Sequence, residues 1–526
     1  MSCAPQAAFG ERQDFLCSFC NWGSHQKSTA TFGRATLKLS FARSPFSVVC
    51  PMVDARCDPS FATVPPFAGI CTPADAVRVG LSVEECVAWL KRLHYVWRRL
   101  HENFTARITS EPLFELKTAF SHQGWLCAEH AGGLRTRVSE LREPPLGLEV
   151  VPHEGLKWIL DELRSAPDGA TFCHGVYGVM LPALRDSIDA YLATTNRLAD
   201  APSVRILRFA RWELDDLLAF GTQACRALPA ENPSECESWK HSLLAALAAA
   251  GGLSGRDAPV GPVPPPHFSR QPWSYDRIPR RDARFHDPYN AGVNPESFLY
   301  DTRFSPRDKT LMLFYKRLRE IDVPEMMASL LVESPDKPWG FHQAMARQLW
   351  DEARHSLMGE AGFAALQVDW RQIPVNFTWS LNLNTQLTPQ ERHAVLFFIE
   401  QGLMPKTGKR YEWEVAQASG VPIAALFQDF DWADEVLHSQ LGREWYVKDF
   451  GNLNSALEYG DRCWSKVMSH WREYLDQGLT THRNWWPEVY SQACTTWGTP
   501  CDPDALAFAE TYETVRADLK EIASSN

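Results

Sequence analysis

The most constraining feature of this sequence is a short motif that occurs twice in the second half of the chain. Both copies read Asp-Glu-x-x-His-Ser-x-x-Gly, and they contain the only two Glu-x-x-His pairs in the sequence. The first copy comprises Asp351, Glu352, His355, Ser356 and Gly359, and the second comprises Asp434, Glu435, His438, Ser439 and Gly442. The shared flanks indicate an internal repeat of one helical hairpin.

The spacing inside each motif indicates its chemistry. Residues three positions apart on an α-helix lie on one face, about one turn apart, so the Glu and the His can reach a common point beside the helix. A carboxylate oxygen and an imidazole nitrogen together bind a divalent transition metal. Two such helices facing each other would hold two ions, but Glu352 and Glu435 would neutralise only half of the charge. We therefore expect one more glutamate on the helix that precedes each motif.

The glutamate of the first hairpin has two candidates. Glu320 and Glu352 lie at similar distances from the turn at 334–338, so an antiparallel hairpin would place them level. Glu325 is the alternative. Pro324 could break a helix there, and Asp322 to Glu325 fits a capping box. Glu320 is the preferred candidate.

The glutamate of the second hairpin is predicted to be Glu400. It follows the apolar run 394–399, and a carboxylate in such surroundings is costly to bury without a partner. A ligand role is therefore favoured. Glu412 and Glu414, nearer the turn at Gly420, are the alternatives.

Hydrophobic periodicity predicts an all-α protein. Apolar residues recur at three- and four-residue spacing between about 82 and 228 and again after about 305, with Pro- and Gly-containing breaks between the segments. The expected divisions are an N-terminal extension (1–75), a helical domain (80–230), a Pro- and Gly-rich linker (231–304), a metal-binding four-helix bundle (305–445) and C-terminal helices packing on the bundle (446–526).

The first fifty residues differ in composition from the rest. No acidic residue occurs between Leu16 and Val53, while basic residues and serines are frequent. This composition fits an organellar transit peptide and equally an extension that precedes a true start at Met52. The fourteen cysteines are scattered, and the pair Cys17 and Cys20 has no second pair at zinc-site spacing. Free thiols in a cytoplasmic protein are expected, or an organellar protein if residues 1–51 are a transit peptide.

Charge and hydropathy exclude two classes of partner. The net charge of −11 and the lack of a dense basic run disfavour binding to nucleic acid. The most apolar stretch, 243–252, is too short and too rich in alanine to span a bilayer. We expect neither a nucleic-acid partner nor a membrane partner.

The predicted ligand set resembles that of the ferritin-like di-iron carboxylate superfamily. Asp-Glu-Ala-Arg-His at 351–355 is similar to the D-E-x-R-H signature of bacterial multicomponent monooxygenase hydroxylases. The resemblance covers about 305–445 and implies a ferritin-like four-helix bundle with two Fe, or Mn and Fe. It also implies that Asp351 and Asp434 orient the histidines, with help from Arg354. The second motif departs from the signature, because Leu437 stands where the Arg would be.

The resemblance implies an O₂-dependent oxidoreductase, an oxygenase or oxidase, that acts on a small organic substrate. The sequence has no flavin or iron–sulfur signature of its own, so electrons would come from an external donor such as a reductase or ferredoxin. The alternatives are a ferroxidase or metal-handling protein, and a non-enzymatic helical scaffold with a structural metal site. The N-terminal helices, with Glu102, Glu129 and His130, could be a degenerate relative of the same bundle.

Overall fold

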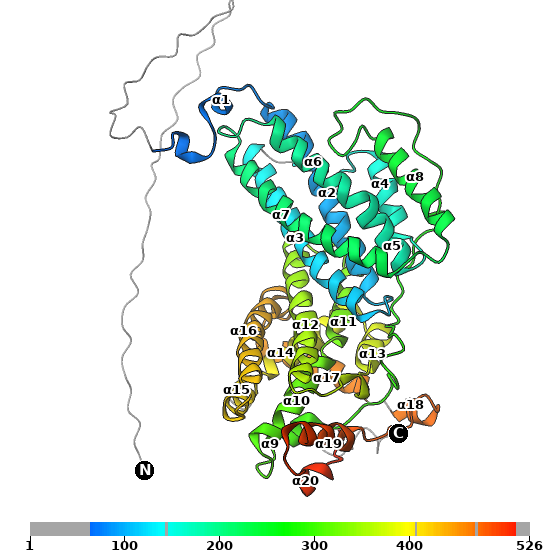
Figure 1. Cartoon of the computed structure of the whole chain (residues 1–526), viewed down its shortest axis with the longest axis vertical. Helices are drawn as coiled ribbons and strands as arrows, with labels where there is room; N and C mark the ends of the chain where they lie inside the picture. The colour runs from blue at the N-terminus through cyan, green and yellow to red at the C-terminus, as the bar shows by residue number, and fades with distance from the viewer. Residues whose placement is uncertain (1–63, 143–145, 406–407, 469–471, 512–526) are drawn as a thin grey trace, which may run out of the picture. The chain divides into compact units, whose positions relative to one another are not determined.

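The computed structural model describes residues 64–142, 146–405, 408–468 and 472–511, and every regular element in these ranges is a helix. The all-α prediction is confirmed for this part of the chain (Figure 1). The chain divides into two units, Met1–Val64 and Pro65–Asn526. The predictions for the first fifty residues, including the start at Met52 and the pair Cys17 and Cys20, lie outside the described residues.

The N-terminal half of the second unit is built on the two long helices α2 and α3, which pack along each other. A capping box between Ser82 and Glu85 fixes the start of α2. The helices of this half are α1 (Pro73–Ala76), α2 (Val83–Ile108), α3 (Phe114–Leu141), α4 (Glu154–Arg164), α5 (Gly169–Gly175), α6 (Leu181–Thr194), α7 (Ala201–Ala227) and α8 (Pro233–Ala249).

The range 231–304, expected to be a linker, contains α8 and the short helix α9 (Pro295–Tyr300) with an extended segment between them. One buried carboxylate anchors this segment. Glu162 on α4 accepts hydrogen bonds from the backbone N–H groups of His267 (2.8 Å) and Phe268 (2.8 Å) and from the Trp239 indole (3.0 Å). A fully paired carboxylate avoids the cost of burying an unpartnered charge, so the segment is held against α4.

The second half contains the helices that carry the repeated motif. They are α10 (Pro306–Arg319), α11 (Asp322–Val332), α12 (Trp339–Ala365), α13 (Thr378–Gln386), α14 (Pro389–Gly402), α15 (Lys409–Ala418), α16 (Pro422–Trp445), α17 (Leu453–Met468), α18 (Arg472–Asp476), α19 (Trp486–Trp497) and α20 (Pro503–Leu506). The first motif lies on α12 and the second on α16, and these two helices pack against each other. Helix α10 packs on α12, and α14 packs on α16, so four helices meet around the motifs.

The serine and the glycine of each motif explain this close packing. A Cβ at Gly359 would lie 2.3 Å from the backbone nitrogen of Leu318, and a Cβ at Gly442 would lie 2.2 Å from the Phe397 ring. Each motif serine also bonds to the neighbouring element: Ser356 Oγ donates to the Leu318 carbonyl (3.0 Å), and Ser439 Oγ donates to the Gln401 side chain (3.1 Å). Ser and Gly in the motif therefore bring α10 close to α12 and α14 close to α16.

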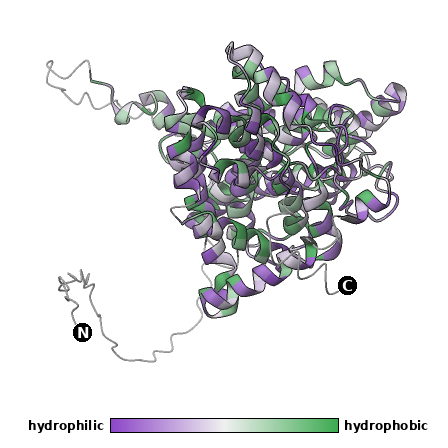
Figure 2. Ribbon diagram, turned by 90° about the horizontal axis from the view of Figure 1, so that it is seen from below, coloured by the Kyte–Doolittle hydropathy of each residue, from purple (hydrophilic) through white to green (hydrophobic). Residues whose placement is uncertain are grey.

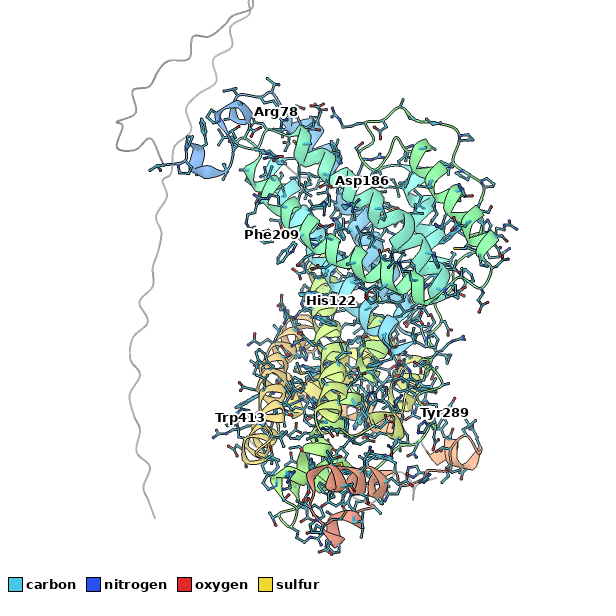
Figure 3. All side chains as sticks on the ribbon, viewed as in Figure 1. Arg78, His122, Asp186, Phe209, Tyr289 and Trp413 are labelled. Atoms are coloured by element: carbon cyan, nitrogen blue, oxygen red, sulfur yellow. The ribbon has the colours of Figure 1, made fainter. Side chains whose placement is uncertain are left out.

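The two halves of Pro65–Asn526 share one apolar core. Buried residues of α2 and α3 lie in the same cluster as buried residues of α11, α12 and α14, and α3 packs directly on α12. His122, labelled in Figure 3, contacts the Trp350 ring across this junction at a centroid distance of 4.5 Å. Individual helices carry both hydrophobic and hydrophilic residues (Figure 2). None of the described helices is both long and apolar enough to cross a bilayer.

Candidate metal centre

The predicted ligands converge where the four helices meet. Ligand atoms of Glu352, Glu400, Glu435 and His438 all lie within 4.8 Å of one another, and all four side chains are buried. A second group of the same kind adjoins it and consists of Glu320, His355 and Asp431. All six ligands predicted from the sequence therefore belong to one cluster, together with one carboxylate that was not predicted.

His355 faces the second group through its Nδ1 atom. This nitrogen lies 3.4 Å from Glu320 Oε2, 3.7 Å from Glu352 Oε2 and 3.6 Å from Asp431 Oδ1. Glu320 does not stand in the middle of a helix, because it ends α10 at the break before α11. The structure places Glu320 beside His355, one turn after Glu352, the residue with which the sequence predicts it to be level.

His438 occupies the corresponding position in the first group. Its Nδ1 atom lies 3.0 Å from Glu352 Oε1, 3.6 Å from Glu435 Oε2 and 3.9 Å from Glu400 Oε1. Glu352 thus directs one oxygen toward each histidine. The imidazole centroids are 6.0 Å apart, so the carboxylate of Glu352 lies between two potential ion positions.

Several atoms that face the centre make no hydrogen bond among the described residues. They are Glu320 Oε2, Glu352 Oε1, Glu435 Oε2, His355 Nδ1 and His438 Nδ1. Buried polar atoms are almost always satisfied, and these five are ligand atoms that point at one another. Their donor set, carboxylate oxygens and imidazole nitrogens, suits Fe, Mn and similar ions. The residues therefore fit a transition-metal centre.

The carboxylates and imidazoles strongly perturb each other's protonation. Burial, followed by the charge of Glu435, raises the pKa of Glu400 well above its usual range. Burial opposes a charge on His355, but Asp434, Glu320 and Glu352 together raise its pKa to about 10. The same balance of burial against neighbouring carboxylates raises the pKa of His438 well above its usual range.

The aspartate that precedes each glutamate contacts the histidine of the other motif. His355 Nε2 lies 3.1 Å from Asp434 Oδ2, and His438 Nε2 lies 3.5 Å from Asp351 Oδ2. Arg354 joins the two aspartates, because its guanidinium contacts Asp351 at 2.7 Å and Asp434 at 2.6 Å. Both aspartates and Arg354 therefore adjoin the histidines, and the pairing is crossed between the two helices. Arg354 thus contacts the aspartates of both motifs, and the second motif has Leu437 at the position of an arginine.

Three charged residues of the centre were missed by the sequence analysis. Asp431 lies one turn before Glu435 on α16 and is completely buried. Lys409 Nζ bonds to both Asp431 oxygens at 2.9 Å and lies 3.0 Å from Glu435 Oε1. Arg317 on α10 contacts Asp431 and lies 2.8 Å from Glu320 Oε1. The four-residue spacing of Asp431 from Glu435 places both on one helix face and could have identified Asp431. Lys409 begins a different helix, so no spacing in the sequence places it near the ligands.

The alternative ligands Glu325, Glu412 and Glu414 belong to neither group of potential ligands, although Gln428 links Glu412 to Asp431. Glu325 contacts Lys117 and Arg281, and the predicted capping box is wrong because Ile321 precedes α11 without a side-chain cap. Glu412 pairs with Lys316, and Glu414 pairs with Arg410 at 3.0 Å. In the N-terminal half, His130 pairs with Glu213 at 2.8 Å, and Glu102 pairs with Arg99 at 3.0 Å.

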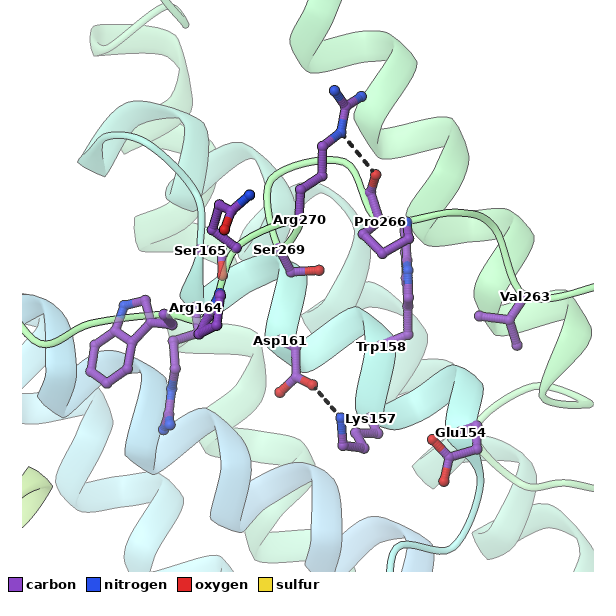
Figure 4. A pocket seen from close by; sticks show the side chains of 13 residues that line it. Glu154, Lys157, Trp158, Asp161, Arg164, Ser165, Val263, Pro266, Ser269 and Arg270 are labelled. Carbon is purple, nitrogen blue, oxygen red and sulfur yellow. Dashed lines mark hydrogen bonds and ion pairs between the residues drawn. The ribbon is translucent and has the colours of Figure 1, made fainter.

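Two of the cavities among the described residues share the stacked pair Arg164 and Trp273 in their lining. One, of about 670 Å³, is shown in Figure 4 and lies between α4 and the segment around Pro266 and Arg270. The other, of about 480 Å³, lies between α2 and the turn that joins α11 to α12. Neither is lined by a residue of the carboxylate–histidine cluster.

Comparison of the chain with protein-family models, with curated proteins and with solved structures gave no match. The functional interpretation therefore rests on the geometry of the cluster.

Proposed function

We propose that this protein is a metal-dependent oxidoreductase of the ferritin-like di-iron carboxylate type, which uses O₂ on a small organic substrate and takes electrons from an external donor. The observation that supports it best is the convergence of ligand atoms from Glu352, Glu400, Glu435 and His438 in a buried site, where Glu352, Glu435 and His438 each have an atom without a hydrogen-bond partner among the described residues. Glu320 and His355 beside them supply a second position.

The proposed role of each residue follows from its contacts. Glu352, with one oxygen toward each histidine, would bridge the two positions. Gln348 donates a hydrogen bond to Glu400 Oε1 at 3.1 Å and would orient that ligand. Asp434 and Asp351 would hold the histidines with Nδ1 toward the ions. Two iron ions held there would supply the redox chemistry that activates O₂, with electrons from the external donor.

A buried centre also suits this chemistry. His355 and His438 have almost no exposed surface, and Glu352 is 2% exposed. Exclusion of water strengthens electrostatic interactions and limits side reactions of reactive species. A metal that only stabilised the fold would not need two adjacent positions joined by one carboxylate.

The proposal is tested by loading the full chain with iron under anaerobic conditions and recording metal content and Mössbauer spectra before and after O₂. We expect iron to bind, to change oxidation state on exposure to O₂, and to be lost in Glu352→Ala. Glu360→Ala, on the same helix but outside the cluster, is the matched control. Iron that binds but stays ferrous in air would contradict the oxidoreductase and favour a structural metal site.

O₂ consumption separates the two redox functions. An oxygenase or oxidase should consume O₂ through repeated turnovers only with an organic substrate and an electron donor. Consumption that is stoichiometric with added Fe²⁺, and independent of any organic compound in a substrate screen, would instead indicate a ferroxidase.

A further inference from the structure

The two halves of the metal centre differ in the fixed positive charge beside them. Lys409 is completely buried and contacts Asp431 through both carboxylate oxygens. Arg317, also buried, contacts Asp431 and Glu320. Arg317 therefore lies on the side of the Glu320–His355–Asp431 group, and Lys409 contacts Asp431 of that group through both oxygens and Glu435 of the other group through one.

These contacts occupy oxygens that an ion at that position would need. Both oxygens of Asp431 face the Lys409 ammonium, and one oxygen of Glu320 faces Arg317. Glu435 also directs Oε1 toward Lys409 at 3.0 Å and leaves only Oε2 for the side of His438. What remains for an ion beside His355 is Glu320 Oε2, one oxygen of Glu352 and the imidazole itself.

The other group keeps a fuller ligand set. Glu352, Glu400 and Glu435 each direct an oxygen toward His438. The neighbour of Glu400 is the neutral amide of Gln348. Three carboxylates with an imidazole attract a divalent ion more strongly than two carboxylates beside an ammonium and a guanidinium, because like charges repel strongly at short range in a buried site.

From this asymmetry we propose that the centre binds its two ions unequally: tightly at Glu352–Glu400–Glu435–His438 and weakly at Glu320–His355–Asp431, with Lys409 setting the difference. This inference rests on the proposed metal centre. The chain holds one divalent transition-metal ion at low metal concentration and fills the second position only in excess. The second position can therefore exchange its ion, or take a different metal, while the first stays occupied.

The test is an anaerobic titration of the metal-free full chain with Mn²⁺. Calorimetry measures the heat of binding, and EPR measures the concentration of free Mn²⁺. We expect one equivalent to bind at least about a hundredfold more tightly than the second. Lys409→Met, which removes the charge and keeps a similar side-chain length, should tighten the second equivalent by about tenfold or more. The affinity for the first equivalent of Mn²⁺ should change less.

Lys316→Met is the matched control. Lys316 is another largely buried lysine, but it pairs with Glu412 and Glu296 and not with a potential ligand, so its removal should change the ratio of the two affinities much less than Lys409→Met does. Glu320→Gln should abolish the weak equivalent and retain the tight one. This second variant tests the assignment even if Lys409→Met does not fold.

The titration distinguishes failure of this inference from failure of the proposed function. Two equivalents of equal affinity in the wild-type chain, or a second equivalent unaffected by Lys409→Met, would overturn the inference and leave the proposed function standing. No binding of Mn²⁺, Fe²⁺ or Co²⁺ at all would overturn the proposed function itself.

Discussion

At the scale of single residues, the metal centre is a set of side chains whose proton affinities depend on one another. His355 illustrates this, because three carboxylates raise its pKa to about 10 against the effect of burial. A histidine whose pKa is higher in the folded than in the unfolded state stabilises the fold when it is protonated. Its contribution is present in full below its unfolded pKa of about 6.5 and is lost as pH rises through about 10.

We therefore expect the metal-free chain to lose stability as pH rises from about 6.5 to 10, by on the order of a few kcal/mol. Metal binding should abolish this loss, because an ion replaces the proton on the imidazole. Urea denaturation of the metal-free and the Mn²⁺-loaded protein across this pH range measures both effects. A metal-free chain whose stability rises steadily to pH 10 would contradict this account of the cluster.

At the scale of elements, the centre depends on how closely the helices approach. Gly359 allows α12 to contact the backbone of Leu318, and that backbone cannot move aside as a flexible side chain could. Overpacking of such a contact typically costs about 1–3 kcal/mol. It would also shift Glu320, which lies two residues after Leu318 and supplies a ligand atom to the second position.

Gly359→Ala should therefore lower the free energy of unfolding by about 1–3 kcal/mol and weaken metal binding. Gly402→Ala is the matched control, since no atom lies within 4 Å of the position that a Cβ would take there, and alanine is the better helix former. Chemical denaturation and Mn²⁺ titration of both variants make the comparison. Equal stability of the two variants would show that the helices can separate without cost.

The repeat was sufficient to predict four members of the cluster, because helical periodicity places the Glu and the His of each motif on one face. Glu320 and Glu400 were predicted from the charge that two ions require, from the position of Glu320 relative to its turn and from the apolar run before Glu400. Arg317 and Asp431 lie one turn from Glu320 and Glu435 and could have been found by the same rule. Lys409 could not, because its approach depends on how α15 packs beside α16. The role of the motif glycines was likewise hidden, since it depends on the distance between helices.

At the scale of the whole molecule, the two halves of Pro65–Asn526 are joined by charge as well as by the apolar core. Lys117 on α3 and Arg281 of the extended segment both contact Glu325 on α11, and all three side chains are buried. Removal of one partner from a buried ion pair leaves an uncompensated charge and typically costs about 3–5 kcal/mol. No spacing in the sequence indicates this network, because Lys117, Arg281 and Glu325 lie far apart along the chain.

Lys117→Met should lower the stability of both halves together, by less than the roughly 3–5 kcal/mol of a lone buried pair, because Arg281 still contacts Glu325. Lys157→Met, which removes an exposed pair with Asp161, should cost less than about 1 kcal/mol. Hydrogen exchange monitored by mass spectrometry distinguishes a joint effect from a local one. Faster exchange confined to α3, with α12 and α16 unchanged, would show that the halves are energetically independent.

The central claim is that side chains from the end of α10 and from α12, α14 and α16 bind transition-metal ions in one buried cluster. Anomalous X-ray diffraction at the iron edge, on crystals of the iron-loaded chain, tests it most directly. The account predicts a strong peak about 2.0–2.2 Å from ligand atoms of Glu352, Glu400, Glu435 and His438, and a weaker one beside Glu320 and His355. Iron-loaded crystals with no anomalous peak within bonding distance of these residues would contradict it.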